Sequence, residues 1–248
     1  MEDNNREESQ NNSQDTFDDP NEIHGPFYDD SGKRISFKEW FFGGDPVKKR
    51  EISGPFLNDI SYKNFRTVLI IAIFMTIITI YHKSTGVRLY ISTIDNFSTF
   101  ESSIQTIFRG FFSLFIHADF GHLTSNLVLL VPFGWLLKNY FGYVAFPVIA
   151  IMGGVITNIL TIFFYKQNYY ETSLVGASGM VYAMVSQWTL LYLRWDKRYS
   201  VGERLLRALG VIMMLLIPTQ YSPSTSYLAH GIGFAVGVIC ALPFLKDD

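Results

Sequence analysis

The sequence predicts an all-α membrane protein, a bundle of six transmembrane helices. Hydrophobic residues make up 48% of the 248 residues and aromatic residues 16%, although the first quarter of the chain is polar. Residues 66–248 are therefore too apolar for an ordinary soluble domain. Six apolar segments each approach the length of about 20 residues that a helix needs to cross a hydrocarbon core. The segments are 66–82, 120–137, 143–165, 177–193, 204–218 and 228–245.

The chain divides into an acidic tail, residues 1–65, and a six-helix domain, residues 66–248. The formal net charge is -2, but the tail holds fourteen acidic and eight basic residues, whereas the domain holds eight acidic and twelve basic residues. The first twenty residues are mostly polar or acidic and have little apolar surface to bury. We therefore expect the tail to be largely disordered, and its start lacks the features of a signal peptide.

Basic residues orient the six segments, because cytoplasmic loops carry an excess of lysine and arginine. The cluster on one side consists of Lys48, Lys49, Arg50, Lys63, Arg66, Lys138, Arg194, Lys197, Arg198, Arg204, Arg207 and Lys246. The other side receives Lys83, Arg88, Arg109 and Lys166, spread through two loops. We therefore expect a multi-pass integral membrane protein of the bacterial inner membrane, with both termini in the cytoplasm. The long outer loop, 83–116, is rich in aromatic residues and suits a segment lying partly in the outer leaflet.

Three polar residues share one depth in this arrangement. His122, Ser178 and His230 each precede a basic residue by sixteen positions, and that residue should mark the cytoplasmic boundary of the second, fourth or sixth segment. At 1.5 Å per residue, each of the three lies about 24 Å from that boundary, close to the outer face. Polar groups inside apolar spans are candidates for function.

Serine and histidine together can support nucleophilic acyl transfer, because the weakly nucleophilic hydroxyl needs a neighbouring base. Ser178 lies between Gly176 and Gly179 at the expected start of a helix. Unpaired backbone N–H groups and the positive end of the helix dipole favour a developing oxyanion there. His122 and Asn126 are four residues apart, so they share one helical face, and an asparagine amide is a common oxyanion donor.

Each residue also has a simpler explanation when it is considered alone. Ser178 could cap a helix, Asn126 could hydrogen-bond between helices, and His230 could be a solvated loop residue. Their common register and depth favour the joint, catalytic interpretation. His117, five residues before His122, is expected to be a structural hydrogen-bonding residue in the outer loop.

The motifs of these three segments resemble those of the rhomboid intramembrane serine proteases, over about three quarters of the chain. The second segment carries a histidine pair followed by HxxxN, the fourth carries GxSGxxxY, and the sixth carries HxxGxxxG. The matching residues are His117, His122 and Asn126, then Gly176, Ser178, Gly179 and Tyr182, then His230, Gly233 and Gly237. The sequence departs from the family pattern at Phe108, where tryptophan is usual, and at Lys138, where glutamate is common.

The resemblance implies that Ser178 is the nucleophile and His230 the base, without an aspartate. It also implies an oxyanion site formed by His122, Asn126 and the backbone N–H of Ser178. Tyr182, four residues after Ser178, is placed to lie against the imidazole of His230. Gly233 and Gly237 form a stripe of small residues that lets the fourth and sixth helices approach closely.

The expected activity is hydrolysis of single-span membrane proteins near the outer membrane face, without a metal or another cofactor. The expected partners are these substrates and the lipid bilayer, with no nucleic acid. The resemblance further implies a small P1 residue in the substrate, entry beside the fifth helix, and a capping loop at 219–229. The alternatives are a catalytically inactive rhomboid-fold binder or chaperone of membrane clients and, third, a transporter or channel, which the scarcity of charges inside the spans disfavours.

Overall fold

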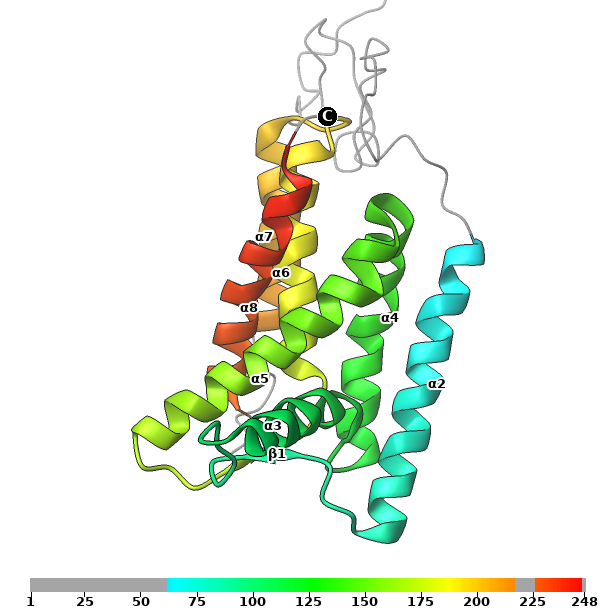
Figure 1. The fold of residues 1–248 in the computed structure, drawn as a ribbon. Coiled ribbons are helices and arrows are strands. Elements are labelled where there is room, and N and C mark those ends of the chain that lie inside the picture. Colours follow the sequence, from blue (N-terminus) through cyan, green and yellow to red (C-terminus); the bar gives the residue numbers. More distant parts are fainter. Residues whose placement is uncertain (1–61, 217–225, 247–248) are drawn as a thin grey trace, which may run out of the picture. The chain divides into compact units, whose positions relative to one another are not determined.

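The computed structural model describes residues 62–216 and 226–246, and it is mostly helical (Figure 1). Except for its last four residues, the tail predicted at 1–65 lies outside the described residues, as does most of the loop predicted at 219–229. The elements in chain order are α2 (Tyr62–Thr85), β1 (Ile91–Ser92), α3 (Phe100–Phe112), η2 (Ser113–Phe115), α4 (Phe120–Tyr143), η3 (Val144–Ile149), α5 (Ala150–Gln167), β2 (Ser173–Leu174), α6 (Ser178–Trp195), α7 (Val201–Leu216), α8 (Tyr227–Ala241) and η4 (Leu242–Phe244).

Each of the six predicted apolar segments overlaps one long helix, namely α2, α4, α5, α6, α7 or α8. Within the described part of the chain, three helical stretches are long and apolar enough to cross a bilayer: Lys63–Thr85, Phe120–Gln167 and Tyr227–Phe244. The middle stretch contains both α4 and α5, and the chain turns between them at Gly142, whose φ of 77° favours glycine. α6 and α7 are not among the three stretches, so the count of six spans stays a prediction.

The outer loop contains a helix, α3, that the apolar pattern did not predict. Its start is fixed by reciprocal hydrogen bonds, because the Thr99 hydroxyl accepts from the Ser102 N–H (3.1 Å) and the Thr99 N–H donates to the Ser102 hydroxyl (2.9 Å). The sequence signal for such a cap is weaker here because serine replaces the usual glutamate at the third position. α3 and β1 lie across one end of the bundle (Figure 1).

α7 begins three residues before the predicted segment for a similar reason. The Glu203 side chain accepts from the Ser200 N–H at 2.8 Å, and the Ser200 hydroxyl accepts from the Glu203 N–H at 3.3 Å. This reciprocal cap satisfies two N–H groups that the first helical turn leaves unpaired, so the helix extends beyond its apolar part.

α6 lies at the centre of the packing, against α8, α5 and α4. Its contact with α8 is closest at two glycines of α8, where an added Cβ would overlap the backbone oxygen of Gly179 or of Ala183. α5 also approaches α6 through Gly154, where a Cβ would come within 2.7 Å of Met180 Cβ. The core around α6 includes the buried residues Leu114, Leu130, Phe146, Met180, Met184 and Leu191. The start of α6 is therefore held by helices on several sides.

Candidate active site

The first residue of α6 is Ser178, and the local backbone leaves its environment open for a ligand. Gly176 has φ 107°, a conformation that side chains rarely adopt, and Ala177 supplies no side-chain cap to the helix. The first N–H groups of an α-helix have no partner within the helix, and they lie at the positive end of its dipole. Ser178 thus presents its hydroxyl beside hydrogen-bond donors that suit an anionic oxygen.

His122 and Asn126, in the first two turns of α4, pack against the segment that leads to Ser178. A Cβ placed on Gly176 would lie 2.5 Å from His122 Cε1, 2.8 Å from His122 Nε2 and 3.5 Å from Asn126 Nδ2. The Asn126 amide also donates to the backbone oxygen of His122 at 3.1 Å. Both predicted oxyanion donors therefore pack against Gly176, two positions before the serine. The absence of a side chain at Gly176 makes room for them.

His230, in the first turn of α8, is stacked on the ring of Tyr182 from α6. The ring centroids are 4.1 Å apart and the planes differ by 11°. Tyr227 makes an edge-on contact with the His230 ring, with centroids 6.1 Å apart. Aromatic packing therefore fixes the plane of the imidazole. Gly233 and Gly237 lie further along α8, where they allow the close contact with α6 and do not line the cavity.

A cavity of about 520 Å³ brings these groups together. Its walls include Ser178, His230, His122, Asn126 and Tyr182, together with Gly176 and Gly179. The side chains of Ser178 and His230 face this common space without a hydrogen bond between them in this structure. The cavity thus contains a hydroxyl, an imidazole and several N–H donors, which are the groups that acyl transfer requires. In the described part of the chain, no three histidine, cysteine or acidic residues are grouped as metal ligands would be.

The cavity also contains residues that the sequence reasoning did not single out. Asn158 of α5 is 3% exposed and donates to the Ser113 hydroxyl at 2.8 Å. Tyr165, near the end of α5, shares a hydrogen bond of 3.0 Å with the hydroxyl of Ser226, which caps α8. Asn158 could have been found as a polar residue inside an apolar segment. Tyr165 could not, because an aromatic residue near the end of a span is ordinary.

Asp119 is the N-cap of α4, and its carboxylate accepts from the backbone N–H of His122 at 2.8 Å. This hydrogen bond favours the ionised carboxylate and lowers the pKa of the Asp119 carboxyl. The cap fixes the first turn of α4, which carries His122. An aspartate directly before an apolar helical segment is a recognisable cap signal, and it was missed here.

His117 lies between η2 and α4, and it connects α2 to the residue before the serine. The Thr79 hydroxyl donates its proton to the Phe115 oxygen at 3.0 Å. In the hydrogen bond between Thr79 Oγ1 and His117 Nδ1 (3.3 Å) the donor is therefore assigned as the Nδ1–H of the imidazole. His117 Nε2 then accepts from the Ala177 N–H at 3.4 Å. Two effects lower the pKa of His117 to about 3: burial, which is the larger, and the nearby His122. This low pKa agrees with a neutral imidazole.

Comparisons with known proteins identify the family of this chain. The family model described as the Rhomboid domain matches residues 105–247, which is more than half of the chain and includes every residue of the candidate site. Rhomboid-like protein 11, chloroplastic, from Arabidopsis thaliana is 29% identical over 138 residues, which cover 50% of this chain and 48% of the relative. The chain therefore spans about half the length of that curated relative. With this match and its long apolar helices, the chain belongs to the rhomboid family and is an integral membrane protein.

Proposed function

We propose that this protein is an intramembrane serine endopeptidase in which Ser178 attacks a substrate carbonyl and His230 acts as the base. The proposed oxyanion site consists of the side chains of His122 and Asn126 and the backbone N–H of Ser178. The observation that carries the proposal is that one cavity contains all of these groups, contributed by the starts of α4, α6 and α8. Membership of the rhomboid family supports the same chemistry.

The stacking of Tyr182 on His230 supports a dyad without a third, acidic member. In a serine–histidine–aspartate triad the carboxylate orients the imidazole. Here a ring 4.1 Å away and nearly parallel constrains the same group. Catalytic hydrogen bonds are often long or poorly aligned before substrate binds, so a Ser178–His230 hydrogen bond is not required in the free protein.

We further propose that the substrates are single-span membrane proteins cleaved near the outer face. Backbone groups inside a bilayer are hydrogen-bonded within their helix, so a scissile carbonyl can be attacked only after the substrate helix unwinds locally. Helix-breaking residues in the outer third of the substrate should therefore favour cleavage. The basic residues at the α6–α7 turn support a cytoplasmic position for that end of the bundle, and with it both termini. We propose in the same way that the protein is located in a bacterial inner membrane.

The proposal is tested with purified full-length protein reconstituted in liposomes together with a single-span substrate that carries a Gly-containing outer third. Ser178→Ala and His230→Ala should each abolish cleavage while leaving insertion and thermal unfolding unchanged, because the two residues act as one unit. A substrate with a poly-Leu span should resist cleavage. Retained cleavage by the Ser178→Ala variant would overturn the serine mechanism.

The second candidate function is a catalytically inactive binder of membrane clients. The missing hydrogen bond between Ser178 and His230 is the observation that favours it. Stable co-purification of a single-span protein with the wild-type chain, combined with no Ser178-dependent cleavage in liposomes, would support this function in place of proteolysis.

A further inference from the structure

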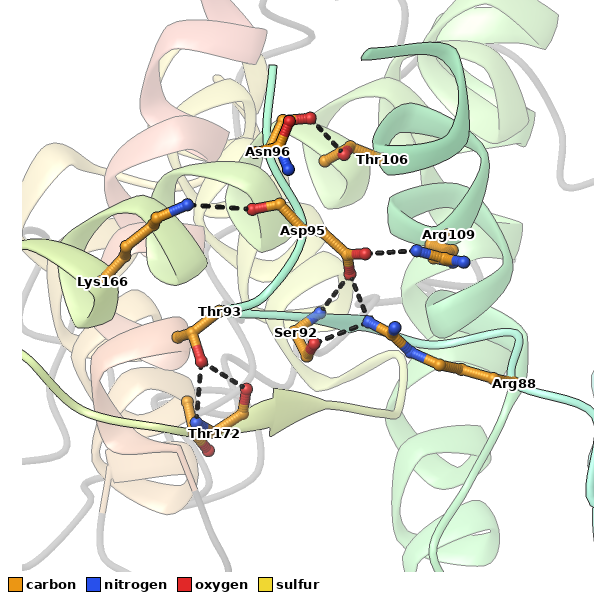
Figure 2. A network of polar contacts seen from close by, with 9 residues as sticks. All are labelled: Arg88, Ser92, Thr93, Asp95, Asn96, Thr106, Arg109, Lys166 and Thr172. Atoms are coloured by element: carbon orange, nitrogen blue, oxygen red, sulfur yellow. Dashed lines mark hydrogen bonds and ion pairs between the residues drawn. The ribbon is translucent and has the colours of Figure 1, made fainter. Parts of the chain in front are cut away.

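Asp95 is a buried carboxylate in the outer loop, outside the cavity described above. Its side chain is 3% exposed. It accepts hydrogen bonds from the Arg88 guanidinium at 2.7 Å, from the Arg109 guanidinium and from the Ser92 backbone N–H at 2.8 Å (Figure 2). Charged groups are buried in proteins only when they are paired and hydrogen-bonded, and Asp95 meets both conditions.

The groups around Asp95 come from four different segments. Arg88 precedes β1, the Ser92 N–H belongs to β1, and Arg109 belongs to α3 (Figure 2). From the end of α5, the Lys166 ammonium donates to the backbone oxygen of Asp95 at 3.3 Å. The Asp95 carboxylate therefore links β1 and the residues before it to α3, and the backbone oxygen of the same residue links this segment to α5.

β1 carries this constraint to the wall of the cavity. It pairs with β2 so that Ile91 lies opposite Leu174. Three further hydrogen bonds join Thr93 to Thr172: the Thr93 N–H and hydroxyl donate to the Thr172 oxygen (3.0 and 3.4 Å), and the Thr172 N–H donates to the Thr93 hydroxyl (3.2 Å). Residues 172–176 line the cavity, and only Ala177 separates them from Ser178. The position of β1 thus sets the position of the segment that ends at the serine.

α3 carries the same constraint by a second route. Arg109 lies four residues before Ser113, whose backbone oxygen accepts from the Gly176 N–H at 2.9 Å. Asn158 holds the Ser113 side chain from α5. The routes through β1 and through α3 therefore both end at Gly176, against which His122 and Asn126 pack.

We propose that Asp95 is a positioning residue for the Ser178 site: it holds β1 and α3 together so that residues 172–176 keep Gly176 against the oxyanion donors. The effect on turnover rests on the proposed protease function, whereas the effect on the 172–176 segment does not. Asp95 touches no reacting group, and it acts only through the backbone that precedes the serine.

The test compares Asp95→Asn with wild type in full-length protein, by hydrogen–deuterium exchange and by cleavage kinetics. Asparagine keeps the size of the side chain but removes the charge that pairs both arginines. We expect amide exchange in residues 172–176 to accelerate about tenfold or more, because the segment opens locally. We expect kcat to fall about tenfold or more with a smaller change in KM, since misplaced catalytic groups lose rate steeply with distance.

Asp196→Asn is the matched control. Asp196 is also buried, at 1% side-chain exposure, and it is also paired with an arginine, Arg198, but at the opposite end of α6 from Ser178. Its loss should leave both exchange in residues 172–176 and kcat of the folded protein at wild-type values. A second variant, Arg109→Lys, keeps the charge but loses the planar guanidinium, so amide exchange in residues 172–176 should accelerate less than in Asp95→Asn. This variant provides the test if Asp95→Asn does not fold.

A rescue experiment separates positioning from general stability. In Asp95→Asn, the added pair Ser92→Cys and Ser173→Cys places two thiols on directly opposed β1 and β2 residues. Oxidation should restore slow exchange and turnover, and reduction should reverse both. Unchanged exchange and kcat in Asp95→Asn, or equal losses in Asp196→Asn, would overturn the proposal. Faster exchange in a protein without Ser178-dependent cleavage would support the positioning role and refute the protease function.

Discussion

Gly176→Ala tests the geometry of the site at its most restrictive position. The new Cβ would lie 2.5 Å from His122 Cε1, whereas ordinary contact begins near 3.4 Å. The His122 ring must therefore retreat by about 0.9 Å, because protein interiors have little spare volume. A misplacement of about 1 Å can reduce the rate about 10²-fold, which is about 2.7 kcal/mol of transition-state stabilisation.

Backbone strain adds a separate cost of about 1–3 kcal/mol in folding free energy, since alanine rarely adopts a positive φ. Gly86→Ala isolates this contribution. Gly86 also has a positive φ, 69°, but nothing lies within 4 Å of its added Cβ. We expect Gly86→Ala to lower the unfolding temperature without changing kcat, and Gly176→Ala to lower both.

The assay is cleavage of a single-span substrate in liposomes, normalised to the folded fraction measured by thermal unfolding in detergent. In a double-mutant cycle, Gly176→Ala should cost little further activity once His122 is replaced by alanine, because both changes remove the same interaction. A Gly176→Ala enzyme whose kcat stays within about twofold of wild type would refute the assigned role of His122 beside Gly176.

Substitutions at three other positions test separate parts of the account. Asn126→Ala should lower kcat about 10²-fold with little effect on KM, as expected for one lost oxyanion donor, and unchanged turnover would make Asn126 structural only. Tyr182→Phe keeps the ring on His230 and should retain most activity, whereas Tyr182→Leu should lose most of it at equal stability, as measured by kcat and thermal unfolding. The neutral state of His117 should stabilise the fold fully above about pH 6.5, its unfolded pKa. This contribution should be lost as pH falls toward the folded pKa of about 3. His117→Gln should flatten the dependence of unfolding free energy on pH, and an unchanged slope would contradict a buried, neutral His117.

The helices and the membership of the rhomboid family could be predicted because both are encoded in local patterns. Apolar segments of span length gave the approximate positions of α2 and α4 to α8. The ordered motifs around His122, Ser178 and His230 predicted the family, and the family comparison confirms that prediction. Spacing also suggested which residues share a helical face.

The contacts between distant segments could not be predicted from these patterns. The β1–β2 pair contains two residues on each side, too few for an alternating pattern, and Asp95 reads as an ordinary loop aspartate until Arg88 and Arg109 are seen beside it. The sequence reasoning likewise treated residues 83–116 as a loop with apolar side chains, whereas a cap at Thr99 starts α3 there. Such features depend on side-chain partners far apart in the sequence.

The most direct measurement of the central claim is covalent labelling of the intact protein in liposomes with a serine-directed fluorophosphonate, followed by mass spectrometry of the modified peptide. We predict a single adduct on Ser178 that forms in wild type and is abolished in His230→Ala, because the hydroxyl reacts only when the imidazole removes its proton. A wild-type protein that is folded and inserted but forms no adduct on Ser178, or forms it equally well without His230, would contradict the proposed dyad.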